Sequence, residues 1–403
     1  MWKTFAVYSK IIVMRYLKYL LLSLVTLFIL SVVFSPLTIK AQEALPDKTE
    51  IVKARVVDVQ DNGTAIIPGL NINNKSQTID ALVLEGNQEG ETVTFSNDYI
   101  QLKKGDIFYL NQTITAVDNR EFYSVEDTYR LPVIYFFAIL FIVLVLLVGG
   151  LQGMRGLVSL AGSFILIIYV LLPGILHGYP PVLVSIGVSS LIIILGSYIT
   201  HGFNKTTSSA VLGMIVTVII TGFMAYKAVH VGQFSGYGTE EATYLNLNSR
   251  GTIDLLGILI GGIMIGLLGI LYDVAIGQAI SVEELHHIAP HIPRVTIFKR
   301  AMRMGREHIG ALVNTLAIAY VGASLPLLLL FSTPPVNISM IMNREIFATE
   351  IIRALIGSIG LVLAVPIVTL LSVYILMPKI KKNIPKEELQ KEKIALEHFE
   401  HKH

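Results

Sequence analysis

Eight apolar runs, each about 17 to 26 residues long, constrain the fold of this chain more than any other feature. A run of about 20 apolar residues has the length of a helix that crosses the hydrocarbon core of a membrane. The sequence therefore predicts an α-helical polytopic membrane protein with about seven core transmembrane helices and one further N-terminal helix. The runs lie at 19–35, 132–150, 156–176, 181–199, 207–229, 253–276, 309–331 and 352–377.

The composition supports this interpretation. Charged residues make up 15% of the 403 residues and hydrophobic residues 53%, whereas soluble domains carry about 25% charged residues. So little charge cannot cover a water-exposed surface, which argues against a cytosolic enzyme. The formal net charge of +2 argues against a nucleic-acid partner held by phosphate contacts. The chain has no cysteine, which excludes disulfides and thiolate-based metal sites.

The first apolar run permits two interpretations. Four basic residues precede it, as in a signal peptide, but no small-residue cleavage site follows it cleanly. An uncleaved signal-anchor helix is favoured over a cleaved signal. Residues 1–42 are therefore assigned to a basic cytoplasmic segment followed by this helix.

Residues 43–130 differ from the rest of the chain because they are polar and contain short β-like runs. Strands are predicted at 51–59, 80–84, 91–95 and 106–110, and Asn62-Gly63 is typical of a two-residue hairpin turn. Several short strands in such a segment favour a small all-β domain, a barrel or a sandwich. A membrane domain at 131–378 and a charged tail at 379–403 complete the predicted organisation.

The basic residues predict the orientation. Short segments on one side of the predicted spans carry 18 Lys and Arg residues, and short loops on the other side carry two, Arg250 and Arg344. Basic residues near the ends of spans stay in the cytoplasm. If the first helix is uncleaved, both termini are cytoplasmic and residues 43–130 are extracytoplasmic.

The segment between the sixth and seventh runs has helical signals of its own. Ser281-Val282-Glu283-Glu284 has the pattern of a capping box, which predicts that a separate helix begins there. A basic amphipathic helix is predicted at 295–306. Glu283, Glu284 and His287 recur at helical spacing, but we interpret them as a solvated face, and we predict no metal and no cofactor.

The sixth run is rich in glycine. Gly257 and Gly261 form one pair at a spacing of four, Gly262 and Gly266 form another, and Gly269 extends the row. Glycines at this spacing permit close helix packing, and glycine also occurs where a transporter helix unwinds near its substrate. Tight packing is the favoured explanation, and a hinge or path is the alternative.

Two aspartates bracket these glycines. Asp254 lies near the outer end of the run, where an acid suits the helix dipole, so stabilisation of the helix N-terminus is favoured over a place on a path. Asp273 lies near the inner end, where the dipole is unfavourable. Since a carboxylate in a span costs at least about 2.5 kcal/mol, Asp273 needs a partner or an ion, and structural and functional roles are equally open.

The seventh run carries a line of polar residues. Glu307, Asn314 and Thr315 lie near one face, with Arg306 at the membrane boundary and Tyr320 further along. The simpler explanation is hydrogen bonding between helices, and the sharper one is a hydrophilic path lined by Asn314, Thr315 and Asp273. Helix breaks are predicted near Gly322 and Pro326, and a kink at Pro366.

Several of these stretches resemble the YibE/F family of bacterial multipass membrane proteins. The matching segments are Tyr123–Arg130, Arg155–Leu157, Leu172–Gly174, Gly178–Pro180, Ala210–Gly213, Gly266–Ala275, Met304–Glu307, Asn314–Gly322 and Arg353–Pro366. One departure is Glu307, where the family pattern usually has Asp, so the acid is kept. The resemblance implies a permease-like architecture in the bacterial plasma membrane and names no substrate.

The first functional hypothesis is a secondary transporter for an unknown small solute or ion, with no enzymatic activity. In it, the sixth and seventh helices line the path, Asp273 binds a cation or proton, and Arg306 and Glu307 form a gate or pair with Asp273. The alternative is a sensor or assembly scaffold that acts through the β domain, and a channel is a third option. Besides the bilayer, a homo-oligomer or a paralogous membrane partner fits the sequence.

Overall fold

The computed structural model describes residues 48–66, 73–115, 120–330 and 337–377. The first predicted helix, at 19–35, and the predicted tail at 379–403 lie outside these residues. The described residues form two compact units, one that ends at Val148 and one that begins at Gly149. Each unit is described by itself.

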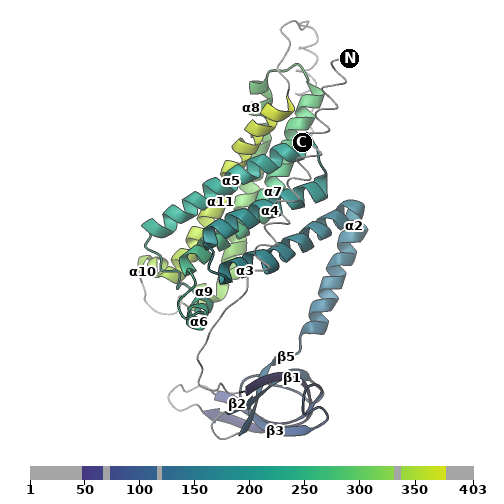
Figure 1. The fold of residues 1–403 in the computed structure, drawn as a ribbon, viewed down its shortest axis with the longest axis vertical. Helices are drawn as coiled ribbons and strands as arrows, with labels where there is room; N and C mark the ends of the chain where they lie inside the picture. The colour runs from purple at the N-terminus through teal and green to yellow at the C-terminus, as the bar shows by residue number, and fades with distance from the viewer. Residues whose placement is uncertain (1–47, 67–72, 116–119, 331–336, 378–403) are drawn as a thin grey trace. The chain divides into compact units, whose positions relative to one another are not determined.

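The N-terminal unit contains a curled antiparallel sheet of five strands in the order β3-β2-β1-β4-β5 (Figure 1). The edge strands β3 and β5 approach each other, and alternate residues of β3 point into the core. Ile79, Phe108 and Leu110 are fully buried there. The prediction of a small all-β domain is confirmed. The strands are β1 (Lys48–Ile66), β2 (Asn73–Val83), β3 (Thr92–Asn97), β4 (Ile107–Ile114) and β5 (Glu121–Thr128).

The prediction of a hairpin turn at Asn62-Gly63 is wrong. Both residues lie inside β1, where the pairing with β2 shifts between Asp61 and Thr64. Gly63 has a φ of 79°, and a glycine in this conformation forms a β-bulge as readily as a hairpin turn. The 19-residue strand β1 pairs with β4 over Lys48–Arg55 and with β2 over Ala54–Ile66, and the bulge lies in the part that pairs with β2.

The chain leaves the sheet through α2 (Leu131–Leu166), which a break at Gly150 divides into two helices. Gly150 has φ 54° and ψ −137°, a conformation that essentially only glycine adopts at little cost. The predicted spans at 132–150 and 156–176 therefore meet at a single residue rather than at a loop. A five-residue π-helix, η1 (Ile167–Leu171), follows α2, and Pro173 lies just beyond it.

The remaining helices form one bundle, in which α7 contacts α4, α5, α8 and α11 (Figure 1). They are α3 (Leu172–Leu176), α4 (Pro181–His201), α5 (Lys205–Val231), α6 (Glu240–Asn248), α7 (Leu255–Ile288), α8 (Arg294–Ala323), α9 (Leu325–Leu330), α10 (Ile338–Asn343) and α11 (Glu345–Leu376). Five segments of the described chain are long and apolar enough to cross a membrane: Leu131–Leu176, α4, α5, α7 and α11. The protein is therefore a multi-pass, membrane-embedded protein with a β-sheet domain.

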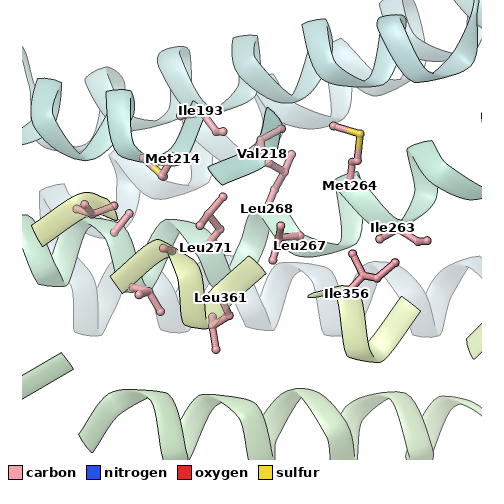
Figure 2. Packing of buried hydrophobic residues seen from close by; sticks show 14 of the residues in the cluster. Ile193, Met214, Val218, Ile263, Met264, Leu267, Leu268, Leu271, Ile356 and Leu361 are labelled. Atoms are coloured by element: carbon pink, nitrogen blue, oxygen red, sulfur yellow. The ribbon is translucent and has the colours of Figure 1, made fainter. Parts of the chain in front are cut away.

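The core of the bundle is built around α7. Its residues Met264, Leu267 and Leu271 meet Met214 and Val218 of α5 and residues of α11 (Figure 2). Half of the 34 residues of α7 are buried, and its length corresponds to about 51 Å at 1.5 Å per residue. A second, smaller core lies where the C-terminal part of α7, the N-terminal part of α8 and the C-terminal part of α11 meet. Leu285, Ile297 and Val373 are packed together there.

α7 and α8 are longer than predicted. α7 continues without a break to Ile288, so the prediction of a new helix at Ser281 is wrong. The Ser281 hydroxyl donates to the carbonyl of Gly277, one turn back in the same helix, instead of capping an N-terminus. The predicted basic helix at 295–306 and the predicted seventh span are likewise one continuous helix, α8.

Glycines set the distance between the helices. A Cβ built on Gly213 of α5 would lie 2.5 Å from Val368 Cγ2 and 3.0 Å from Val368 Cα of α11. A Cβ on Gly360 of α11 would lie 2.7 Å from the Thr221 hydroxyl oxygen of α5. Since lipid tails are as apolar as the side chains, close packing rather than the hydrophobic effect holds such helices together.

This packing predicts opposite effects for two Gly→Ala substitutions. Gly213→Ala should lower the free energy of unfolding by about 1–3 kcal/mol because the new methyl group overlaps Val368. Gly187→Ala in α4 has nothing within 4 Å and should be neutral or stabilising by up to about 1 kcal/mol, from helix propensity. Unfolding of both variants in detergent micelles checks this. Equal stability of the two would contradict the assigned packing.

Candidate functional site

The glycines of α7 fall on two different faces. A Cβ on Gly257 would lie 3.0 Å from Pro181 Cβ, and a Cβ on Gly261 would lie 2.3 Å from the Ser185 hydroxyl oxygen. Both neighbours belong to α4, so this pair serves tight packing. The favoured explanation for Gly257 and Gly261, tight helix packing, agrees with these contacts.

The second row of glycines lies on an exposed side of α7, which we call the open face. Gly262, Gly266, Gly269 and Asp273 follow one another at spacings of four, three and four, which places them on one face of α7. All four are exposed. A Cβ on Gly262 or Gly269 would have no heavy atom within 4 Å, and one on Gly266 would meet only the Tyr320 hydroxyl oxygen, at 3.3 Å. Packing inside the described chain therefore does not account for this row.

Asp273 lies on this open face. Within the described ranges, its carboxylate makes no ion pair or hydrogen bond, and no ion pair joins it to Arg306. Arg306 and Glu307 are both exposed on α8. Their predicted gate and the predicted ion role of Asp273 stay predictions.

Asp254 has a structural role. Its side chain accepts a hydrogen bond of 2.9 Å from the backbone N–H of Gly257 and thereby caps the N-terminus of α7. Such caps contribute about 1 kcal/mol. The capping explanation therefore accounts for Asp254, and its place on a path stays a prediction.

The polar residues of α8 do not share one environment. Asn314 and Glu307 are exposed on the side opposite Gly305 and Leu316, which are buried. The Thr315 hydroxyl donates to the carbonyl of Ala311 in its own helix, at 3.0 Å. No hydrogen bond joins Asn314 or Thr315 to Asp273 in the part of the chain that the structure describes, so the path lined by these three residues also stays a prediction.

The helix breaks predicted near Gly322 and Pro326 coincide with the end of α8. α8 ends at Ala323, directly after Gly322, and α9 begins at Leu325. Pro326 has no N–H to donate to the carbonyl of Gly322, four residues earlier, and its ring clashes with that carbonyl, which accounts for a break between the two. Pro366 lies inside α11, which continues through it to Leu376.

The structure contains an ion pair on α11 that was not predicted from the sequence. Arg353 and Glu350 approach to 3.0 Å, with side chains 29% and 23% exposed. The predicted span began at residue 352 and so left Glu350 outside. An acid and a base at a spacing of three in an otherwise apolar helix is the signal that identifies such a pair.

A cavity of about 440 Å³ lies beside this pair, between α8, α9, α10 and α11. Tyr320 of α8 and Ser324, which directly follows α8, line it together with Glu350, and most of its other walls are apolar. Tyr320 thus links the cavity to the open face of α7, because its hydroxyl oxygen lies beside Gly266. Tyr320 of α8 and Glu350 of α11 therefore border one cavity next to Gly266 of α7.

The N-terminus of α11 is tied to the loop that follows α5. The Glu345 carboxylate accepts hydrogen bonds from the backbone N–H groups of Ser235 and Gly236, at 2.9 and 2.7 Å, and from the Ser235 hydroxyl, at 2.6 Å. Three donors on one carboxylate fix this end of α11. They therefore fix Glu350 and Arg353 one to two turns further on.

The β unit has a polar cluster of its own. The Tyr123 hydroxyl donates to Glu121 at 2.6 Å, and the Gln88 amide donates to Glu121 at 3.2 Å. These two hydrogen bonds hold the pKa of Glu121 below its usual range. Gln112 donates to Gln88 at 2.7 Å. Because these side chains bind one another, the cluster stabilises the sheet and does not point to a ligand.

The ion pair on α11 leads to a stability prediction. Arg353→Met leaves the Glu350 carboxylate half-buried without its counter-charge, and we expect a loss of roughly 1–3 kcal/mol in the free energy of unfolding, less than for a fully buried pair. Adding Glu350→Gln removes the stranded charge and should recover part of the loss. Unfolding of the single and double variants in micelles checks this. A double variant less stable than the single variant would contradict it.

Comparison with known proteins agrees with this architecture. The family model described as YibE/F-like protein matches residues 137–378, more than half of the chain. Neither the curated proteins nor the solved structures include a match. The match covers the helices of the bundle and the cavity between them. The chain therefore belongs to the YibE/F-like family of proteins.

Proposed function

We propose that the protein is a secondary transporter, or permease, for a small solute or ion in a bacterial plasma membrane. Seven helices cross the membrane: the two halves of Leu131–Leu176, α4, α5, α7, α8 and α11. The β unit lies outside the cytoplasm, as the distribution of basic residues favours. The transport path follows α7 and α8, and α11 forms a further wall.

The observation that carries this proposal is the position of Tyr320. Its side chain lines the 440 Å³ cavity together with Glu350, and its hydroxyl oxygen lies next to Gly266 on the open face of α7. Hydroxyl and carboxylate groups between membrane helices are costly unless they pair with other groups or face a cavity that holds water, a solute or an ion. Asp273 lies seven residues from Gly266 on the same face, and in this proposal it exchanges the coupling cation or proton.

The composition of the cavity favours a particular solute chemistry. Its walls are mainly apolar, with the carboxylate of Glu350 and the hydroxyls of Tyr320 and Ser324 as the polar groups. Arg353 offsets the charge of Glu350, so the cavity does not favour a strongly charged metal ion. These groups suit a small amphipathic solute that donates hydrogen bonds.

Three strains test the proposal: a deletion, the deletion with wild type restored, and the deletion with Asp273→Asn. We expect one small solute or element to shift in the deletion, to return with wild type, and to stay shifted with Asp273→Asn at unchanged protein level. Transport of that species should fall roughly tenfold or more, which corresponds to about 1.4 kcal/mol or more. Glu350→Gln should impair transport in the same direction.

Glu240→Gln provides the matched control, since Glu240 is an exposed carboxylate in the short α6. It should restore transport as well as wild type does. If no species shifts in the deletion, or if Asp273→Asn restores as well as wild type, the transporter proposal fails. A variant that lacks residues 45–128 then tests the scaffold, which requires the β unit for every phenotype.

A further inference from the structure

A second cavity lies where the C-terminal end of α5 meets the N-terminal end of α11. Its volume is about 720 Å³, larger than that of the 440 Å³ cavity. The last turn of α5, the residues that follow it, α10 and the first two turns of α11 line it. In the proposed orientation this is the outer end of the bundle. We call it the outer cavity, and we call the cavity beside Glu350 the Glu350 cavity.

The outer cavity and the Glu350 cavity are neighbours. Met342 of α10 and Ile351 of α11 line both of them. On α11, Ala348 lines the outer cavity and Glu350 lines the Glu350 cavity, and Ile351 lies between these two on the helix surface. The side chains of Met342 and Ile351 therefore form the partition between the two cavities.

The part of this partition that α10 supplies is weakly held. α10 has six residues, none of them buried, and it packs against α11. Elements with few buried contacts open locally at a small cost in free energy. The wall on α11 is fixed instead, because Glu345 accepts three hydrogen bonds from the loop that follows α5. A movement of α10 alone therefore joins the two cavities.

An unusual backbone conformation places an amide in the wall of the outer cavity. At the end of α5, the Gln233 N–H donates to the carbonyl of His230 at 3.2 Å, and the next N–H donates to the carbonyl of Val229 at 3.1 Å. This is a Schellman motif, in which glycine usually occupies the position of Gln233. Gln233 has a φ of 54°, and strained residues of this kind cluster at ligand sites. Its side chain lines the outer cavity.

The groups that line the outer cavity suit a neutral solute. Gln233 and Asn343 supply side-chain amides, which donate and accept hydrogen bonds. Among the described residues, Glu345 is the one ionisable group in its wall, and its three donors and the N-terminus of α11 offset its charge. In the Glu350 cavity, Arg353 offsets Glu350 in the same way.

We propose that the outer cavity is the entry site for a neutral solute that forms hydrogen bonds, and that this solute reaches the Glu350 cavity when Met342 moves away from Ile351 with α10. The amides of Gln233 and Asn343 receive the solute. This inference rests on the proposed transport function. It adds the side of entry, the class of solute and the element that separates the two cavities.

Because the chain has no cysteine, access to the Glu350 cavity can be measured with one introduced thiol. Ala354→Cys places that thiol in the wall of the cavity, where it reacts with a charged methanethiosulfonate only as a thiolate in contact with water. With the reagent outside right-side-out vesicles, we expect labelling. Because labelling follows the population of the open form, Met342→Ala should speed it and Met342→Trp should slow it, each by roughly tenfold.

Met340 and Tyr244 provide the controls. Met340 belongs to α10 but lines neither cavity, so Met340→Ala and Met340→Trp should leave the labelling rate of Ala354→Cys unchanged. Tyr244→Cys, exposed on α6, gives the intrinsic rate of each reagent, by which the other rates are divided. Membrane protein level shows that each variant has folded.

Three results would overturn the proposal, and none of them requires transport to be observed. Labelling of Ala354→Cys only in inverted vesicles excludes entry from the outer side. Equal effects of the changes at Met342 and Met340 exclude the partition. A difference of more than about tenfold between a cationic and an anionic methanethiosulfonate, as a charged route produces, excludes a neutral solute.

A variant of Gln233 separates binding from folding. Gln233→Gly removes the amide and relieves the backbone, so thermal stability in micelles should be equal or higher. Transport of the species identified with the three strains should nevertheless fall about tenfold, whereas Gln233→Asn, which keeps an amide and tolerates a positive φ, should retain most of it. Wild-type transport by Gln233→Gly would overturn the entry site. Loss of the transport function itself would appear in the wild-type strain, and the labelling rates would still decide the route.

Discussion

Close packing against glycine is the constraint on which the bundle depends. Apolar side chains gain little from leaving lipid for the interior of a membrane protein, so helices associate where their backbones approach closely. Gly213 and Gly360 bring α5 and α11 together, and Gly257 and Gly261 bring α7 against α4. These contacts surround α7 and leave half of its residues buried.

The same constraint identifies the surfaces that are free for function. On α7, one glycine row is filled by a neighbouring helix, and the other remains open and leads to Asp273. On α8, one side is packed, and the opposite side exposes Asn314. Small and polar residues on a membrane helix are expected where another helix, a solute or an ion takes the place of lipid. Where neither packing nor water satisfies them, they mark a site.

The ion pair of α11 shows how a charge is tolerated in this environment. Glu350 and Arg353 are partners within one helix, and the nearby N-terminus is held by the hydrogen bonds of Glu345. A lone carboxylate in a span has no such compensation. Glu350 is compensated in this way, whereas Asp273 makes no ion pair or hydrogen bond within the described residues.

Whether the role of a residue could be predicted depended on how far along the chain its deciding partners lie. Asp254 could be assigned to stabilisation of a helix N-terminus because that effect depends on an acid close to the start of the helix. Asn62-Gly63 was assigned wrongly because a glycine with positive φ serves a hairpin turn and a β-bulge equally well, and pairing partners far along the chain decide between them. Ser281 was assigned wrongly because its local pattern competes with the apolar face that carries α7 through to Ile288.

By itself, the sequence determined the membrane class, the β domain before the bundle and most of the long apolar helices, because these depend on the length and composition of continuous segments. The family followed from the resemblance of short motifs. Only the tertiary structure decided which glycine row is filled, which side of α8 faces outward, and that Tyr320, Gly266 and Glu350 border one region. The physical reason is that a helix repeats every 3.6 residues whatever surrounds it. Its period shows which residues share a face, and the neighbouring helices decide what that face meets.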